Sequence, residues 1–241
     1  MVSPSPPPLR AAIFGAGGGI GRAIAHNLAA SGWQAHGGGR RPPLIEGVDA
    51  FTFDLTDEAS IAAAAQAIGG PLDLVFVATG LLQDSARGIV PERSLRALDG
   101  AAMAHTFAIN TIGPALIAKH ATPLLRRDGR AVFAALSARV GSIEDNRLGG
   151  WHAYRASKAA LNMIVRNVAI ELARTRPQAI AVALHPGTVD TALSAPFQRG
   201  LPEGQLTTAE AAAANLLAVI GALGPADSGS FFAWDGAAIP F

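Results

Sequence analysis

Short apolar runs that alternate with longer alanine-rich segments constrain the fold of this 241-residue chain more than any other feature. Each run is bounded by Gly, Pro or Asp and is apolar almost throughout, which is typical of strands buried on both faces of a parallel sheet. The five runs lie at residues 11–14, 51–54, 72–78, 130–136 and 179–185. This pattern predicts a mostly parallel sheet that is covered by helices.

The segments between the runs have the length and composition of crossover helices. They span residues 19–31, 57–68, 101–125, 151–174 and 207–223, with Thr56 and Thr207 as expected N-caps. Strands that alternate with helices form right-handed βαβ units and hence a doubly wound α/β domain, whose ligand crevice lies at the carboxyl ends of the strands. We expect one domain over residues 9–241, preceded by a disordered lead-in at 1–8 that is rich in proline and serine.

The composition argues against several kinds of partner. The formal net charge is +1 and the arginines are scattered, so the chain lacks the basic patch that nucleic acids or anionic membranes require. The chain has no cysteine, which excludes disulfides, Cys-based zinc sites and thiol nucleophiles, and we expect no metal site. No export signal is recognised, and the apolar runs are shorter than the about 20 residues that span a bilayer. We expect a cytoplasmic protein with neither nucleic-acid nor membrane partners.

A glycine-rich turn, Gly-Ala-Gly-Gly-Gly-Ile-Gly, follows the first predicted strand and leads into the first predicted helix. A turn at this junction brings unpaired N–H groups and the positive end of a helix dipole to one point, which is a ready site for an anion. The expected contacts to a pyrophosphate are Gly15, Gly17, Gly18, Gly19, Ile20 and Gly21. Glycine-rich turns also occur without a ligand, but the position between strand and helix favours a dinucleotide site.

The residues after the second strand, around 34–39, indicate which dinucleotide is bound. This strand ends at Gly39-Arg40-Arg41, where an NAD-specific protein would usually carry an acid for the ribose 2′-hydroxyl. A guanidinium can instead pair with the additional 2′-phosphate of NADP, so NADP(H) is favoured over NAD(H), with Arg40 and Arg41 as contacts. The alternative is that both arginines only solvate a loop before two prolines. The glycine run 37–39 has no explanation in the sequence.

The chemical centre is expected at Tyr154, the only tyrosine, and Lys158, one of two lysines. Residues four apart lie on one face of a helix, so the phenol and the ammonium can both face the crevice. A free phenol has a pKa of about 10, and a neighbouring cation favours its ionised form. The pair indicates an acid or base at a substrate oxygen, with Ser137, directly after the strand 130–136, placed to hydrogen-bond the same oxygen.

These motifs together resemble the short-chain dehydrogenase/reductase family. The glycines at 15, 19 and 21 follow its G-x-x-x-G-x-G spacing instead of the common G-x-G-x-x-G, although Phe14 stands where the family often has threonine. The remaining matches occur in the family's order at Asn110, Ser137, Tyr154, Lys158, Pro186 and Gly187. Residues 78–80, 142–146 and 232–236 are most similar to the C-factor and sniffer-like carbonyl reductase branch.

The resemblance implies a Rossmann-type sheet of seven strands and a role for each matching residue. Asn110 would anchor a water that relays protons to Lys158, which would also hydrogen-bond the nicotinamide ribose. Asp54 and Leu55 would contact the adenine, although Asp54 could equally cap the next helix. The other implied cofactor contacts are Ala78, Thr79, Gly80, Pro186, Gly187, Val189 and Thr191. His185 is interpreted as a packed structural residue, because it ends a strand before a proline.

Two functions are compatible with these residues. The first is an NADP(H)-dependent oxidoreductase that transfers hydride between nicotinamide and a carbonyl or secondary alcohol, with Tyr154 as general acid or base. Residues 193–206 are the expected substrate lid, and a small apolar substrate is predicted from Leu193, Pro196, Phe197, Leu201 and Leu206. The alternative is a dinucleotide-binding regulatory or signalling protein of the C-factor type with little turnover. The resemblance also implies a homodimer or homotetramer formed through residues 101–125 and 151–174.

Overall fold

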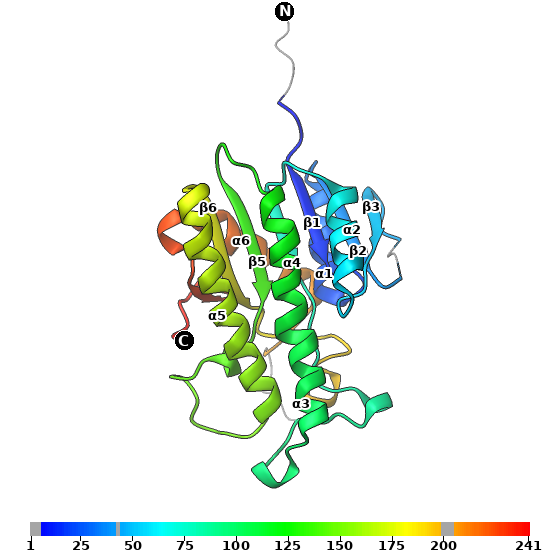
Figure 1. Cartoon of the computed structure of the whole chain (residues 1–241), viewed down its shortest axis with the longest axis vertical. Helices are drawn as coiled ribbons and strands as arrows, with labels where there is room; N and C mark the ends of the chain where they lie inside the picture. Colours follow the sequence, from blue (N-terminus) through cyan, green and yellow to red (C-terminus); the bar gives the residue numbers. More distant parts are fainter. Residues whose placement is uncertain (1–5, 42–43, 199–204) are drawn as a thin grey trace, which may run out of the picture.

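Seven parallel strands form one sheet at the centre of the computed structural model, which describes residues 6–41, 44–198 and 205–241 (Figure 1). In sheet order these strands are β3 (Val48–Thr52), β2 (Gln34–Gly39), β1 (Arg10–Phe14), β4 (Leu74–Val77), β5 (Ala131–Leu136), β6 (Ala179–His185) and β9 (Phe231–Ala233). The direction of winding reverses between β1 and β4, which is where a doubly wound sheet places its ligand crevice. The predicted α/β fold is therefore confirmed. Residues 1–5 of the expected lead-in lie outside the described residues.

Helices cover both faces of the sheet (Figure 1). One face is covered by α2 (Glu58–Ile68), α4 (Gly113–Ala121) and α5 (His152–Thr175), and the other by α1 (Gly19–Ala30) and α6 (Ala209–Ala222). Successive residues of a strand point to opposite faces, so Phe14 of β1 enters the first core and Ile13 enters the second. Both side chains are fully buried. The sheet is thus a rigid platform whose carboxyl edge carries the loops.

The helix predicted over residues 101–125 is divided into four pieces. They are α3 (Gly100–Phe107), the π-helical turn η3 (Ala108–Ile112), α4 and the short 3₁₀ turn η4 (Thr122–Leu124). Single π-helical turns inside α-helices are frequent at functional sites. The hydroxyl of Thr111 in this turn donates to the main-chain oxygen of Ser157 in α5 at 2.8 Å. The irregular turn therefore faces the helix that carries Tyr154 and Lys158.

This helical stretch, Gly100–Leu124, also has the length and composition of a membrane-spanning helix. Its most apolar window of 18 residues has a mean hydropathy of 1.3, and 39% of that window is buried. The core helix of a globular domain passes the same test, and α4 packs against α2 and α5. Its sequence contains no long uninterrupted apolar run, because polar residues such as His105, Asn110 and Lys119 are scattered along it. That the protein has no membrane partner remains a prediction.

The N-caps of α2 and α6 are Asp57 and Thr208, and the predicted Thr56 and Thr207 are each wrong by one residue. Each true cap accepts a hydrogen bond from an N–H of the first helical turn. Thr56 instead donates its N–H and its hydroxyl to Oδ1 of Asp54, at 2.8 and 2.7 Å. Thr207 belongs to the short strand β8 (Leu206–Thr207), which pairs with β7 (Thr188–Val189).

The glycine run in β2 makes room for an aromatic cluster. A Cβ on Gly38 would lie 2.0 Å from Cε2 and 2.2 Å from Cζ of Phe51, which is a steric overlap with its ring. Phe51 belongs to β3, which lies at Val48–Thr52 and not at the predicted 51–54. Phe14 meets Phe51 and Phe53 edge to face, with ring centroids 5.1 Å apart in both pairs. Gly38 is therefore explained by packing, and Phe14, where the family often has threonine, anchors the cluster.

Candidate active site

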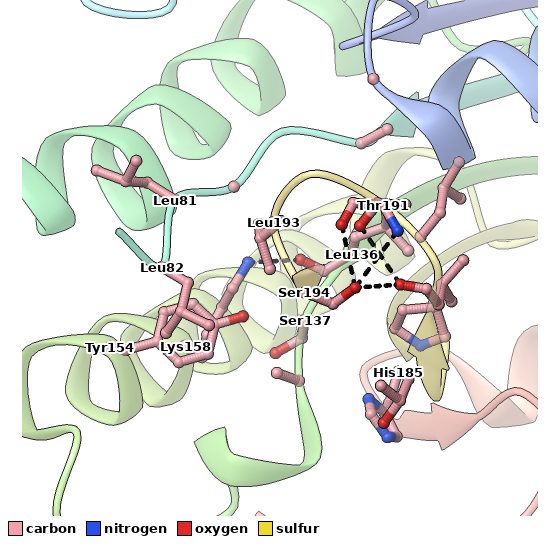
Figure 2. A pocket seen from close by; sticks show the side chains of 18 of the residues that line it. Leu81, Leu82, Leu136, Ser137, Tyr154, Lys158, His185, Thr191, Leu193 and Ser194 are labelled. Carbon is pink, nitrogen blue, oxygen red and sulfur yellow. Dashed lines mark hydrogen bonds between the residues drawn. The ribbon is translucent and has the colours of Figure 1, made fainter. Parts of the chain in front are cut away.

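A cavity of about 800 Å³ opens at the carboxyl ends of the central strands (Figure 2). The predicted site residues that line it are Gly18, Gly19, Ile20, Gly21, Ala78, Thr79, Gly80, Ser137, Tyr154, Lys158, Pro186, Gly187, Val189 and Thr191. The predicted residues that lie outside its wall are Gly15, Gly17, Arg40, Arg41, Asp54, Leu55 and Asn110. The fold thus brings the glycine turn and the Tyr-Lys pair, which are far apart in the sequence, to one cavity.

The glycine turn approaches its neighbours too closely for side chains. A Cβ on Gly21 would lie 2.3 Å from the carbonyl oxygen of Gly15, and one on Gly15, where φ is +102°, would lie 2.9 Å from the carbonyl carbon of Ala78. A Cβ on Gly17 would meet no described atom within 4 Å, so this side of the turn is open. Gly18 is the N-cap residue of α1. No side chain of the described residues caps this helix, and its first turn contains no acidic residue. Free N–H groups therefore point to the open side, where an anion can bind.

Other parts of the cavity wall also fit a dinucleotide. The hydroxyl oxygen of Thr79 is buried and has no hydrogen-bond partner among the described residues. A Cβ on Gly19 would lie 2.9 Å from Cγ2 of Thr191, so Thr191 lies against the glycine turn. The N–H of Thr191 lies 3.3 Å from Oγ of Ser194, which fixes this segment (Figure 2). An unpartnered hydroxyl and an open glycine turn in one cavity are the groups that a nicotinamide dinucleotide would engage.

Tyr154 and Lys158 both lie on α5 and enter the cavity (Figure 2). They are 7% and 2% exposed, and Nζ of Lys158 lies 6.0 Å from the centroid of the Tyr154 ring. Nζ also donates to the main-chain oxygen of Leu136 at 2.8 Å. The sequence pattern placed these two side chains on one helical face, and they do lie together on it.

The electrostatics of the pair differ from the sequence-based expectation. Burial raises the pKa of the Tyr154 phenol well above its ordinary value, and burial lowers the pKa of Lys158 to about 8. Desolvation disfavours the charged form of each group. In the protein alone, burial therefore sets the direction of the shift in the phenol pKa, and the expectation that Lys158 favours the phenolate stays a prediction. The phenol keeps its proton at neutral pH and is available as a proton donor.

Ser137 follows β5 and is buried beside Asn162, a residue of α5 that sequence reasoning missed. The Ser137 hydroxyl donates to Oδ1 of Asn162 at 2.7 Å. In the part of the chain that the structure describes, the buried Nδ2 of Asn162 has no partner. A half-turn of the amide would let Nδ2 donate to Ser137 and free the hydroxyl hydrogen for a substrate oxygen. The sequence feature that could have identified Asn162 is its spacing, because it lies four residues after Lys158 and so on the same side of the helix.

Asn110 lies in the π-helical turn η3 and is fully buried. Its Oδ1 accepts from the N–H of Leu81 at 2.7 Å, and its Nδ2 donates to the Leu81 carbonyl at 2.8 Å and to Oγ of Ser157 at 3.0 Å. These bonds tie the chain after β4 to the start of α5. The side-chain amide is thus engaged by protein groups, and the water-anchoring role of Asn110 stays a prediction.

The residues expected at the adenine end lie away from the cavity. The two arginines after β2 are exposed. Hydrogen bonds from Thr56 are the main cause of the lowered pKa of Asp54, and the charge of Arg40 also lowers it. The alternative that Asp54 caps α2 is wrong, because its carboxylate binds Thr56. Leu55 is buried, and a Cβ on Gly113 would lie 2.3 Å from its Cγ, so its side chain packs in the core.

Several residues of the cavity wall were not predicted. They are Leu81, Leu82, Gln83, Ser85, Leu136, Ala138, Arg139, Val140, Trp151, His185, Thr188 and Ala192. Many of them directly follow a strand, which is the signal that could have found them. His185 is more than a packed structural residue: it lines the cavity, burial lowers its pKa to about 4, and its Nδ1 lacks a partner among the residues described. Of the expected lid 193–206, Leu193 and Ser194 line the cavity, while residues 199–204 lie outside the described residues.

Residues 10–201 match the family model described as short chain dehydrogenase. The chain belongs to the short-chain dehydrogenase family. This dehydrogenase is 39% identical to C-signal of Myxococcus xanthus over 145 residues, which cover 60% of this chain and 81% of that protein. It is 34% identical to 1-hydroxy-2-glutathionyl-2-methyl-3-butene dehydrogenase of Rhodococcus sp. over 186 residues, which cover 76% of each protein.

Solved structures show the same relationship. The dehydrogenase superposes on the NADPH-bound carbonyl reductase from chicken fatty liver with a TM-score of 0.83 and 25% identity, covering 97% of this chain and 99% of that one. A short-chain dehydrogenase/reductase from Burkholderia multivorans with bound NADP gives a TM-score of 0.79 and 25% identity, covering 98% and 100%. The chain also shares its fold with carbonyl reductase Sniffer of D. melanogaster, with a TM-score of 0.79 and 21% identity. This match covers 97% of this chain and 99% of that one. The protein is an oxidoreductase that acts on CH–OH or C=O groups with a nicotinamide dinucleotide.

Proposed function

We propose that this short-chain dehydrogenase is an NADPH-dependent carbonyl reductase in which Tyr154 gives its proton to the carbonyl oxygen. The observation that carries the proposal is the buried phenol of Tyr154, which lines the same cavity as the open glycine turn. Burial raises the pKa of this phenol, so it holds a proton at neutral pH. A group in that state is suited to protonate an oxygen on which negative charge develops.

The side chains around Tyr154 divide the remaining tasks. When bound, the reduced nicotinamide supplies the hydride for the carbonyl carbon. Ser137 hydrogen-bonds the carbonyl oxygen and orients it toward the phenol. Lys158 supplies positive charge next to the phenolate that proton transfer leaves behind, and its pKa of about 8 keeps much of that charge at neutral pH. In the direction of oxidation, the phenolate takes the proton from the alcohol.

NADP(H) is the proposed dinucleotide because of the residues after β2. Arg40 is exposed there and close enough to Asp54 to lower its pKa. A guanidinium at this position offers paired donors to a 2′-phosphate, which an acid would repel. Two structural relatives at 25% identity are described with NADPH or NADP bound, which supports the same choice.

A small apolar carbonyl compound is the proposed substrate. The cavity that Tyr154 enters is also lined by the apolar side chains of Leu81, Leu82 and Leu193 (Figure 2) and by Val140. Apolar walls with a few convergent polar groups are typical of small-molecule sites. Here the convergent polar groups would be Tyr154 and Ser137.

The alternative function is a dinucleotide-binding regulatory protein with little turnover. It is favoured by the relative named C-signal, which is 39% identical over 145 residues. Retention of the buried Tyr154, Lys158, Ser137 and Asn110 favours the enzyme, because a sensor needs no proton donor at the substrate end of the cavity. Turnover distinguishes the two functions.

We also propose a cytoplasmic homodimer or homotetramer formed through α4 and α5. Met163 and Ile170 lie seven residues apart on one side of α5 and are 60% and 45% exposed. Ile112, at the start of α4, is 53% exposed. Exposed apolar side chains that gather on helix faces mark contacts between proteins. Light scattering should give a mass of two or four chains, and Met163→Glu should reduce it, whereas a monomeric wild-type protein would refute this part.

Consumption of NADPH with a panel of carbonyl compounds tests the proposed function. Small apolar ketones and aldehydes should support turnover, and matched carbonyl compounds that carry a charged group should support much less. Binding of NADPH without turnover of any compound would contradict the reductase and favour the regulatory alternative. Equal turnover of charged and apolar compounds would contradict the proposed substrate class.

A further inference from the structure

Trp151 has an unusual backbone conformation at the entrance of α5. Its φ and ψ are 50° and 44°, in the left-handed region, and it is the one non-glycine residue with a positive φ among residues 6–41, 44–198 and 205–241. It follows Gly149 and Gly150, whose φ values are 62° and 66°. A bulky residue rarely adopts this conformation, and it persists only where the surrounding structure imposes it.

Glu92, from the segment between β4 and α3, imposes this conformation. Its main-chain carbonyl accepts a hydrogen bond from the N–H of Trp151, and its carboxylate accepts one from the N–H of Ala153 at 3.2 Å. Glu92 is only 6% exposed. A Cβ on Gly150 would lie 3.4 Å from the same carbonyl oxygen, so the approach is tight. The buried carboxylate also lies at the positive end of the α5 dipole, which stabilises it there.

The indole of Trp151 forms part of the cavity wall next to the proton donor. Trp151 and Tyr154 both line the cavity, and their rings meet edge to face at 74°, with centroids 6.2 Å apart. This contact joins the N-cap residue of α5 to the first turn of the helix. The other large apolar side chains that line the cavity among the described residues are aliphatic, namely Ile20, Leu81, Leu82, Leu136, Val140, Val189 and Leu193. Trp151 thus adds a large aromatic surface to an otherwise aliphatic wall.

A tryptophan at a position suited to glycine requires a reason other than backbone preference. Residues in rarely populated backbone conformations are frequent at ligand sites, so the conformation of Trp151 indicates a functional role. We infer that Trp151 is a specificity-determining residue, whose indole selects carbonyl compounds that carry an aromatic ring, and that Glu92 positions it. Aromatic rings attract one another through offset and edge-to-face contacts beyond the effect of their area. The inference rests on the proposed carbonyl reduction.

Two ketones of equal carbon number, acetophenone and cyclohexyl methyl ketone, provide the test. The measured quantity is the ratio of their kcat/KM values with NADPH. Trp151→Leu should lower the ratio of the aromatic to the alicyclic ketone by about three- to tenfold, which is the size of an aromatic pair contribution. Trp151→Phe retains a ring at the same strained backbone position and should keep the ratio within about twofold of the wild type. An unchanged ratio in Trp151→Leu would overturn the inference.

The role of Glu92 is tested by Glu92→Gln and Glu92→Ala. Glutamine retains an oxygen that can accept from Ala153 and should preserve the wild-type ratio, whereas alanine should shift the ratio toward that of Trp151→Leu. A lower melting temperature of Glu92→Ala with an unchanged ratio would assign Glu92 a structural role only and overturn its positioning role.

Calorimetric titration separates this inference from the proposed function. Acetophenone is titrated into the protein with NADP⁺ present, which has no hydride to transfer to the ketone, for the wild type and both Trp151 variants. Weaker binding to Trp151→Leu, by about threefold or more, supports the inference even if no ketone is reduced. If acetophenone binds more weakly to Trp151→Leu but no ketone is reduced, only the proposal of a reductase fails. Equal affinity of all three proteins would overturn the inference whether or not turnover occurs.

Discussion

Nζ of Lys158 donates a hydrogen bond to the main-chain oxygen of Leu136 at 2.8 Å, which joins α5 to the last residue of β5. Ser137 follows Leu136 directly, so this bond fixes the lysine relative to the residue that is expected to orient the substrate. It also holds the buried ammonium in place in the protein alone.

The stability of the apo-protein should depend on pH through Lys158. Burial lowers its pKa from 10.5 to about 8. Between pH 8 and 10.5, Lys158 holds its proton in the unfolded chain but loses it in the folded chain. The free energy of unfolding therefore rises with pH, by about 2 kcal/mol from pH 7 to 10. Lys158→Met should remove this rise. The check is urea unfolding of both proteins at several pH values below 10, where tyrosine ionisation does not interfere. Parallel pH dependences of the two proteins would contradict the prediction.

Exchange of Arg40 for aspartate should reverse the nucleotide preference. An acid repels the 2′-phosphate of NADPH and accepts a hydrogen bond from the 2′-hydroxyl of NADH, so the ratio of the two affinities should change by at least about tenfold. Fluorescence titration with both nucleotides measures it. Arg174→Asp is a matched control, because it makes the same charge change in the last turn of α5. An unchanged preference in Arg40→Asp would mean that the arginine only solvates its loop.

Ser137 and Asn162 should act as a unit. Ser137→Ala should lower kcat/KM by about 10²-fold, since it removes a donor to the substrate oxygen. Asn162→Ala should also lower kcat/KM, because the hydroxyl loses the partner that lies 2.7 Å away. The double variant should be no slower than Ser137→Ala alone. Asn215→Ala in α6, which covers the opposite face of the sheet, is the control and should leave the rate unchanged. Fully additive losses would show that the two side chains act separately.

Alanine at position 38 should destabilise the protein. The new Cβ would overlap with the ring of Phe51, and such overpacking typically costs about 1–3 kcal/mol. Gly38→Ala combined with Phe51→Leu should recover part of the loss. Gly221→Ala in α6 is the matched control, because its Cβ meets no described atom within 4 Å and alanine favours helix. Urea unfolding measures all four proteins. Equal stabilities of Gly38→Ala and the wild type would refute the packing explanation.

The strands, the glycine turn and the Tyr154–Lys158 pair could be predicted because each depends on local pattern. Apolar runs indicate buried strands, and four-residue spacing places two side chains on one helical face. The Gly37–Gly39 run could not be explained in this way. Gly38 is required by Phe51, which lies on the neighbouring strand, and no local pattern records that contact.

The features of the fold and the site that were not predicted from the sequence depend on contacts between residues far apart in the chain. The phenol of Tyr154 was expected to be acidified by Lys158, but burial by residues from several elements has the larger effect. The helix predicted over 101–125 contains a π-helical turn because Asn110 and Thr111 bond to α5 and to the chain after β4. Trp151 depends on Glu92, which lies far from it in the sequence. Such pairs become visible only when the chain is folded.

Replacement of Tyr154 by phenylalanine tests the central claim most directly. The measurement is the rate of NADPH oxidation with a carbonyl substrate of the wild-type protein, together with NADPH affinity by fluorescence. Because the ring is retained and only the donor hydroxyl is lost, the rate should fall by about 10²–10⁴-fold while the affinity for NADPH stays within about twofold. A Tyr154→Phe protein that oxidises NADPH at the wild-type rate would contradict the account.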